Sequence, residues 1–139
     1  MENKSATELT EYLTLDDEGH VTLDMRKQQL IKVPEALTDL TNLEKLYLRD
    51  NTINRLPTGV NKLKNLKVLF LDKNRLTDLP DSIGDLKELR ELSVKGNKLS
   101  ILPASIRQLT NLEKLKLGGN KLTNLPDSIG DLKIGRAHV

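Results

Sequence analysis

Two histidines, His20 and His138, are the candidate general bases of this 139-residue chain. Nucleophilic catalysis of the Ser–His–acid kind needs a histidine beside a hydroxyl, and neither histidine lies in such a motif. The sequence has no phosphate-binding loop, no G-x-G-x-x-G and no H-E-x-x-H. The neighbouring carboxylates Asp16 and Asp17 are typical of a solvated turn, and the absence of cysteine excludes thiolate metal ligands. We therefore expect no enzymatic activity, no metal and no cofactor from these residues.

The residue types that do recur with regular spacing are leucine, asparagine and proline. Shifting the chain by 23 positions superposes three columns on themselves. The columns are Leu43, Leu66, Leu89 and Leu112; Asn51, Asn74, Asn97 and Asn120; and Pro34, Pro57, Pro80, Pro103 and Pro126. A fixed period between about 20 and 50 residues is the signature of a repeat array.

Each unit joins two periodicities. The first half, LxxLxLxxN, alternates as a short strand does, with Leu46 and Leu48 pointing inward and Tyr47 outward. The second half, LPxxIxxL, spaces its apolar residues as one helical or 3₁₀ turn does. Stacked units therefore predict an α/β solenoid, with a curved parallel sheet on the concave face and short helical or 3₁₀ turns on the convex face.

The asparagine column follows the strand, where the backbone turns sharply and its amide and carbonyl groups lose their sheet partners. A short side chain with both donors and an acceptor can bridge to such groups in its own and adjacent units. We therefore interpret Asn51, Asn74, Asn97 and Asn120 as a structural ladder, not as catalytic residues.

The pattern LxxLxLxxNxLxxLPxxIxxLxx resembles the leucine-rich repeat family in its intracellular, typical form, such as Ras-group and Scribble-type scaffold repeats. Five units are predicted at 20–42, 43–65, 66–88, 89–111 and 112–134. Residues 1–19 are expected to form an N-terminal cap: a short helix that begins with a Ser5–Glu8 capping box and places Leu9, Tyr12 and Leu13 on one face, followed by a turn. His20 is interpreted as a residue at the edge of that cap.

The last residues break the pattern. Residues 134–139 read Ile-Gly-Arg-Ala-His-Val where a sixth unit should begin. They resemble the translation of a common sequencing-library adapter, so we expect native sequence to end at Lys133 and the natural array to continue beyond it. A coding sequence that does not match the adapter would contradict this expectation.

Three observations favour a cytosolic or nuclear protein, and we expect the cytoplasm. Extracellular members of the resembled family usually carry cysteine clusters at their ends, and this chain has no cysteine. The first residues lack the basic and apolar regions of a signal peptide. The longest strongly apolar run is Val68 to Leu71, far too short to span a membrane.

The outward strand positions form the candidate binding surface. They include eight basic and four acidic residues, which gives +4 on this face against +2 for the whole chain. Two of the three aromatic residues, Tyr47 and Phe70, should lie side by side there. Aromatic residues beside arginines are typical of interface hot spots, although cross-strand stabilisation is an alternative explanation. The predicted binding residues are Arg26, Lys45, Tyr47, Arg49, Val68, Phe70, Lys73 and Lys95.

A protein-binding scaffold or recognition module is the function that these features and the resemblance imply. The family suggests a small GTPase or a phosphatase as partner, and we expect a monomer if the array is capped. Interspersed acidic residues disfavour nucleic acid. The alternative is the N-terminal recognition region of a larger signalling enzyme: a kinase, a cyclase, a ubiquitin ligase or a Roco-type GTPase.

Overall fold

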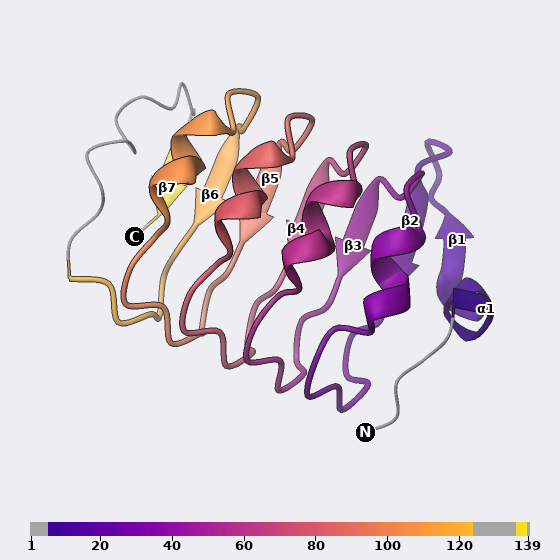
Figure 1. The fold of residues 1–139 in the computed structure, drawn as a ribbon, viewed down its shortest axis with the longest axis horizontal. Coiled ribbons are helices and arrows are strands. Elements are labelled where there is room, and N and C mark those ends of the chain that lie inside the picture. Colours follow the sequence, from indigo (N-terminus) through magenta and orange to yellow (C-terminus); the bar gives the residue numbers. More distant parts are fainter. Residues whose placement is uncertain (1–5, 124–135, 139) are drawn as a thin grey trace.

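The computed structural model describes residues 6–123 and 136–138, and the side chains of residues 8–123. Seven strands form one sheet in which the strands follow each other in sequence order (Figure 1). They are β1 (Leu13–Leu15), β2 (Val21–Asp24), β3 (Lys45–Tyr47), β4 (Val68–Phe70), β5 (Glu91–Ser93), β6 (Lys114–Lys116) and β7 (Arg136–His138).

Strands β2 to β6 are parallel and aligned by the repeat period. Leu23 pairs with Leu46, Leu46 with Leu69, and the series continues through β5 and β6. Each central leucine points inward, so its two neighbours in the strand point to the opposite face. The predicted parallel sheet of stacked units is therefore confirmed.

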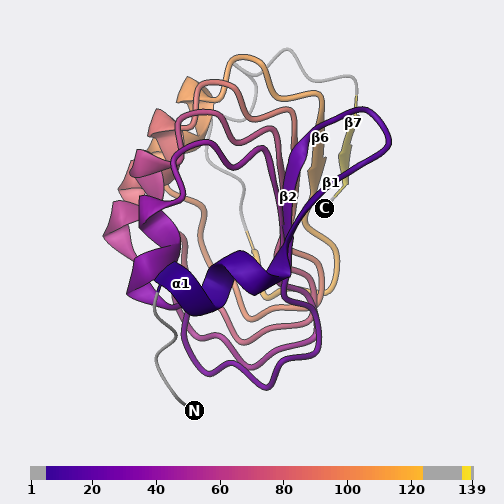
Figure 2. The same cartoon turned by 90° about the vertical axis from the view of Figure 1, so that its right-hand side faces the viewer.

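The second half of each described unit is a short 3₁₀ turn. These turns are η2 (Glu35–Asp39), η3 (Thr58–Lys62), η4 (Asp81–Asp85) and η5 (Ala104–Gln108). Proline precedes every one, with φ of −58° at Pro34 and −67° at Pro57 and Pro103. The fixed φ of proline suits the entry to a helical turn, where the missing N–H is not needed. The turns form a second layer opposite the sheet (Figure 2).

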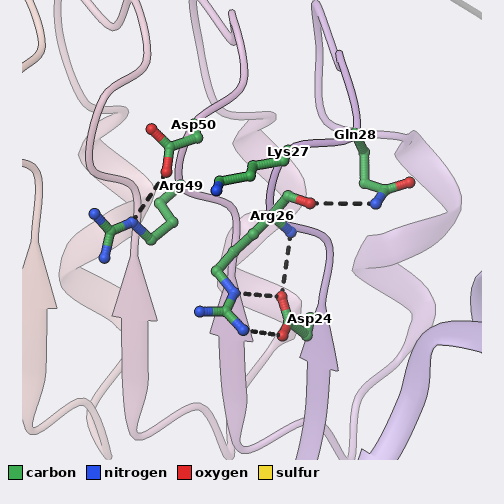
Figure 3. Close-up of a pocket in the computed structure, with 6 residues that line it drawn as sticks. All are labelled: Asp24, Arg26, Lys27, Gln28, Arg49 and Asp50. Atoms are coloured by element: carbon green, nitrogen blue, oxygen red, sulfur yellow. Dashed lines mark hydrogen bonds and ion pairs between the residues drawn. The ribbon is translucent and has the colours of Figure 1, made fainter.

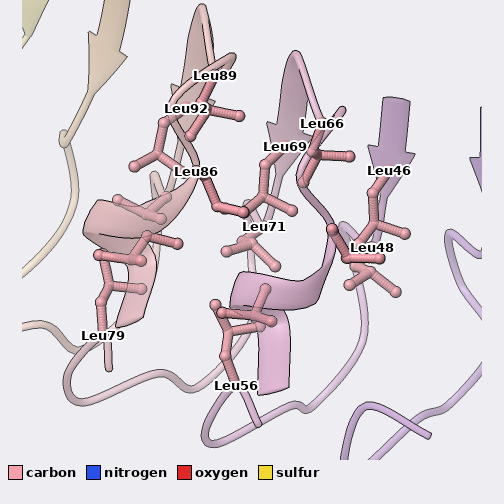
Figure 4. Packing of buried hydrophobic residues seen from close by; sticks show 14 of the residues in the cluster. Leu46, Leu48, Leu56, Leu66, Leu69, Leu71, Leu79, Leu86, Leu89 and Leu92 are labelled. Atoms are coloured by element: carbon pink, nitrogen blue, oxygen red, sulfur yellow. The ribbon is translucent and has the colours of Figure 1, made fainter. Parts of the chain in front are cut away.

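The core lies between the two layers as one continuous cluster of aliphatic side chains (Figure 4). Every apolar residue expected to point inward in the third unit is at most 4% exposed. These residues are Leu66, Leu69, Leu71, Leu76, Leu79, Ile83 and Leu86. Full burial of each such side chain contributes roughly 1.5–3 kcal/mol, and most of it comes from contacts with the adjacent units.

The asparagines of the ladder join neighbouring units through buried hydrogen bonds. Asn74 donates through Nδ2 to the carbonyl of Leu71 in its own unit and to that of Leu48 in the preceding unit, both at 3.0 Å. Its Oδ1 accepts the N–H of Ile53 at 3.0 Å. Asn51, Asn97 and Asn120 repeat this bridging arrangement. The side chain thus supplies the partners that the turning backbone lacks.

A second asparagine column, which the sequence interpretation missed, lies at the end of the units. Asn65 donates to the carbonyl of Thr41 at 3.1 Å, and Asn111 donates to that of Lys87 at 2.7 Å. Both bonds are exposed and cross from one unit to the preceding one. The signal was present in the sequence as asparagine at the last position of several units, with Glu88 replacing it in the third.

The N-terminal cap differs in part from the prediction. The helix is short, with α1 (Ala6–Leu9) continuing into η1 (Thr10–Tyr12), and Leu9 is fully buried. Leu13 does not continue the helical face; it begins β1, which pairs antiparallel with β2. The strand covers an edge of β2 that would otherwise present unpaired backbone groups. Gly19 closes the intervening turn at φ +83°, and Ser5 lies outside the described residues.

The last strand of the array does not follow the 23-residue period. Strand β7 pairs parallel with β6, and Arg136 lies opposite Lys114, which is 22 residues earlier instead of 23. The second half of the fifth unit falls within residues 124–135, outside the described part of the chain. The division into five units and the adapter origin of the tail therefore stay predictions.

Replacing Asn74 by alanine should lower the free energy of unfolding by about 1–3 kcal/mol. The change leaves the carbonyls of Leu48 and Leu71 and the N–H of Ile53 without that side-chain partner in a buried place. Urea unfolding measures the effect. Asn111→Ala is the matched control, because its single bond is exposed; an equal loss in both variants would contradict the role of the ladder.

Replacing Gly84 by alanine should also destabilise the chain, by about 1–3 kcal/mol, because the turn layer has no room for a methyl group there. A Cβ at Gly84 would lie 2.6 Å from the backbone oxygen of Ser105. The same change at Gly59 would meet Thr38 at 3.5 Å, an ordinary contact. Thermal unfolding of Gly84→Ala and Gly59→Ala compares the two, and equal melting temperatures would contradict the close approach of η4 and η5.

Candidate protein-binding surface

Tyr47 and Phe70 lie side by side on the face of the sheet that points away from the core. They are register partners on β3 and β4, and their rings stack with centroids 5.3 Å apart and planes 17° apart. Both side chains are half-buried, while their neighbours Leu46 and Leu69 are buried beneath them. The strand alternation thus positions an aromatic pair in contact with solvent. We call this outward side of β2 to β6 the sheet face.

Arg26 extends the aromatic pair toward the first unit. Its guanidinium carbon lies 5.9 Å from the centre of the Tyr47 ring, within the range of a cation–π contact. Asp24 fixes the guanidinium with two bonds, 2.9 Å from Nε and 2.7 Å from Nη2 (Figure 3). The Arg26 guanidinium lowers the pKa of Asp24, and the Asp24 carboxylate raises the pKa of Arg26. Both groups are therefore charged at neutral pH.

A polar cavity of about 590 Å³ opens beside Arg26, where β2 and β3 end. It is lined by Asp24, Arg26, Lys27, Gln28, Arg49 and Asp50. Arg49 Nε lies 3.3 Å from the carboxylate of Asp50. Lys27 and Gln28 were not among the predicted binding residues, although Lys27 occupied one of the outward columns.

The remaining predicted residues do not join this cluster. Lys45 is held by Asp16 of the N-terminal turn, with 2.6 Å between Nζ and Oδ2, so the cap neutralises one cation of the surface. Val68 is half-buried on β4. Lys73 and Lys95 follow β4 and β5, and neither forms an ion pair within the described residues. The structure thus brings together Arg26, Tyr47, Arg49 and Phe70 and leaves two lysines along the same edge.

Two outward positions are buried instead of exposed. Ser93, the register partner of Phe70, is 2% exposed, and its hydroxyl has no hydrogen-bond partner within the described residues. Thr22 is 6% exposed and donates to the carbonyl of His20. Strands about 4.8 Å apart let larger neighbours cover small side chains, which strand alternation alone does not show.

Other kinds of site find no support in the part of the chain that the structure describes. No group of three or more acidic or histidine side chains there could hold a metal ion. Among the same residues, no helix combines the length and apolar character needed to cross a membrane.

Two family models of leucine-rich repeats match the sequence, one over residues 41–99 and a two-copy model over residues 87–130. A solved structure, the ectodomain of the receptor kinase SOBIR1 from Arabidopsis thaliana, is 31% identical, and the match covers 84% of this chain and 67% of that one, with a TM-score of 0.69. The chain belongs to the leucine-rich repeat family. Repeats of this family are typically non-catalytic and serve as protein-interaction modules.

Two further structures show the same fold. A leucine-rich repeat protein of Leptospira interrogans is 34% identical with a TM-score of 0.69, and the match covers 78% of this chain but 29% of that one. A chain of the BIR3–SERK2 complex from Arabidopsis thaliana is 28% identical with a TM-score of 0.72, over 89% of this chain and 73% of that one. The chain thus spans under a third of the length of the Leptospira protein. A comparison with curated proteins found no match.

Asp16 links the cap to the sheet face. Its carboxylate contacts Lys45 and His20 Nδ1, at 2.6 and 3.1 Å, and accepts the N–H groups of Glu18 and His20. The ammonium of Lys45, followed by the backbone N–H of His20, holds the pKa of Asp16 well below its ordinary value of 3.8. A lowered pKa means that the contribution to stability is present above the ordinary value and is lost as pH falls through the folded one.

We therefore expect the hairpin of β1 and β2 to keep its full amide protection between pH 7 and 5 and to lose the contribution of Asp16 progressively as the pH falls below 3.8. Asp16→Asn should speed hydrogen exchange at β1 at neutral pH. Asp17→Asn, at the exposed neighbouring position, is the control. Equal exchange rates in the two variants would contradict the linkage.

Proposed function

We propose that the chain is a protein-recognition module that binds its partner on the sheet face, with Tyr47 and Phe70 at the centre of the contact. The observation that carries this proposal is the stacked, half-exposed aromatic pair with a guanidinium beside it. Tyrosine and arginine are enriched among residues that dominate binding energy, and they act best when clustered.

Cross-strand stabilisation alone is the competing explanation. A stacked aromatic pair contributes about 0.5–1.5 kcal/mol beyond its burial. In this chain the buried leucines beneath already form the core, and the pair leaves part of each ring accessible to solvent. Two hydrogen bonds from Asp24 orient Arg26 beside Tyr47, which lowers the entropy lost when a partner binds. Preorganisation favours recognition over packing.

The charge of the sheet face favours an acidic partner. The carboxylates of Asp24, Asp50 and Asp16 each engage one cation. Lys73 and Lys95 form no ion pair within the described residues and keep the edge of the face positive. Complementary charge steers association and suppresses partners of the same sign. We therefore extend the proposal to an acidic patch on a small GTPase or a phosphatase in intracellular signalling, the partners that the family resemblance suggests.

The absence of cysteine supports a cytoplasmic setting, and we extend the proposal to that location and to a monomeric scaffold. A recognition region of a larger protein would use the same surface. The small share of the Leptospira protein that this chain matches is compatible with that second arrangement.

The double variant Tyr47→Ala, Phe70→Ala should lose partner binding at least about tenfold, since hot-spot residues cost 2 kcal/mol or more when truncated. Its melting temperature should fall, because the stacked pair is lost, but the chain should stay folded, because the rings are not part of the core. Quantitative pull-down from extracts of the source cells measures retention.

The matched control removes two exposed apolar residues away from the strands, Ile31→Ala with Ile101→Ala; these side chains are 52% and 63% exposed. Proteins that wild type and control retain equally, and that the aromatic variant releases, are the expected partners. If the aromatic variant retains every protein that the control retains, the proposal is wrong.

A further inference from the structure

The cavity beside Arg26 contains an imbalance of charge that its own residues do not resolve. Three cations, Arg26, Lys27 and Arg49, face two carboxylates, Asp24 and Asp50. Each carboxylate is engaged by one arginine. Lys27 forms no ion pair with the described residues, and its side chain extends toward Arg49 and Asp50 (Figure 3). Lys27 and Arg49 therefore both line the cavity, and the cavity carries a net charge of about +1.

The nitrogen atoms of Arg49 are only partly used. Asp50 contacts Nε, and the two terminal nitrogens form no hydrogen bond with the described residues. Terminal guanidinium nitrogens match the two oxygens of a carboxylate in a bidentate pair. Asp50 thus orients the guanidinium of Arg49, whose two terminal nitrogens point away from the Asp50 carboxylate (Figure 3).

The backbone gives an independent observation. Lys27 and Asp50 adopt left-handed conformations, with φ of 55° and 59°, which disfavour residues other than glycine. The equivalent positions in the fourth and fifth units are Gly96 and Gly119, both at φ 69°. Glycine is therefore compatible with this position. The first three units nevertheless carry charged side chains there, and Lys73 of the third unit, at φ 57°, lies outside the cavity. The left-handed backbone thus follows the repeat, and in the first two units it places a charged side chain at the cavity.

The backbone amides of these residues are already used. The N–H of Lys27 donates to the carbonyl of Arg49 at 3.2 Å, and that of Asp50 donates to the carbonyl of Asp72 at 3.0 Å. Gln28 accepts from the Tyr12 hydroxyl and donates to the Arg26 carbonyl. A ligand of the cavity would therefore be recognised by the free ends of Lys27 and Arg49.

We propose that this cavity is a carboxylate-binding site that receives an aspartate or glutamate side chain of the protein bound on the sheet face. A single negative charge neutralises the site, whereas a dianionic phosphate would overshoot it. The identity of the partner's side chain rests on the proposed function; the affinity of the cavity for a carboxylate does not.

Acetate is the probe that tests the cavity without a partner. Titration of the ¹⁵N-labelled chain with sodium acetate, at constant ionic strength maintained with sodium chloride, should shift the Arg49 Nε–H and the Lys27 and Asp50 amide signals in a saturable way. Arg49→Gln should weaken acetate binding at least about tenfold, as expected for a lost charge-assisted pair. Lys64→Gln removes one positive charge at an exposed position outside the cavity and the strands, and it should leave the affinity unchanged.

Lys27→Gly should change two measured quantities, stability and acetate affinity, in opposite directions. Relief of the left-handed strain should raise the urea midpoint of unfolding, while loss of the ammonium should lower acetate affinity. Unchanged acetate affinity in Lys27→Gly or Arg49→Gln would overturn the proposal, as would shifts that chloride reproduces.

Phosphate that binds more tightly than acetate would overturn the choice of a carboxylate. If the chain binds acetate but the aromatic variant still retains all partners, the cavity is a carboxylate site and the hot-spot assignment is wrong. Loss of partners by the aromatic variant, with no acetate binding to the chain, would support the hot spot and reject the carboxylate site.

Discussion

The structure depends on hydrogen bonds between adjacent repeat units, because each turning segment has backbone groups that find no partner within their own unit. A unit whose strand is three residues long cannot satisfy its own backbone or cover its own leucines. From the second unit on, the ladder asparagine donates to carbonyls of two units and accepts an N–H from the preceding one, as Asn74 does for Leu48, Leu71 and Ile53. Stacking is therefore required for stability, and the stacking fixes the 23-residue register of the side chains on β2 to β6.

The side chains available for binding are those that neither the core nor the asparagine ladder uses. Core and ladder use the inward side chains, so residues between the leucines are available for contacts outside the chain. In the first three units this position holds Asp24, Tyr47 and Phe70, and an arginine follows two residues after the first two of them. Register pairing turns this column into a stacked aromatic pair beside a fixed guanidinium. The recognition surface that we propose thus consists of positions where residue changes do not affect the core.

Periodicity predicted the parallel sheet, the 3₁₀ turns, the buried leucines and the outward placement of Tyr47, because each depends on contacts that repeat. Features that occur once were not predictable in this way. Strand β1 arises because the first unit lacks a preceding neighbour, and the ion pair of Asp16 with Lys45 depends on that hairpin. Burial of Ser93 depends on the size of its neighbours. The left-handed backbone of Lys27 was not predictable from its own unit, because only the fourth and fifth units carry glycine at the equivalent position.

The most direct test is covalent footprinting of the chain with and without a purified partner, using a reagent that labels exposed side chains irrespective of type. Binding on the sheet face predicts that labelling of Tyr47 and Phe70 falls in the complex while labelling of Ile31 and Ile101, away from the strands, stays the same. Unchanged labelling of both rings, with protection at Ile31 and Ile101, would contradict the account.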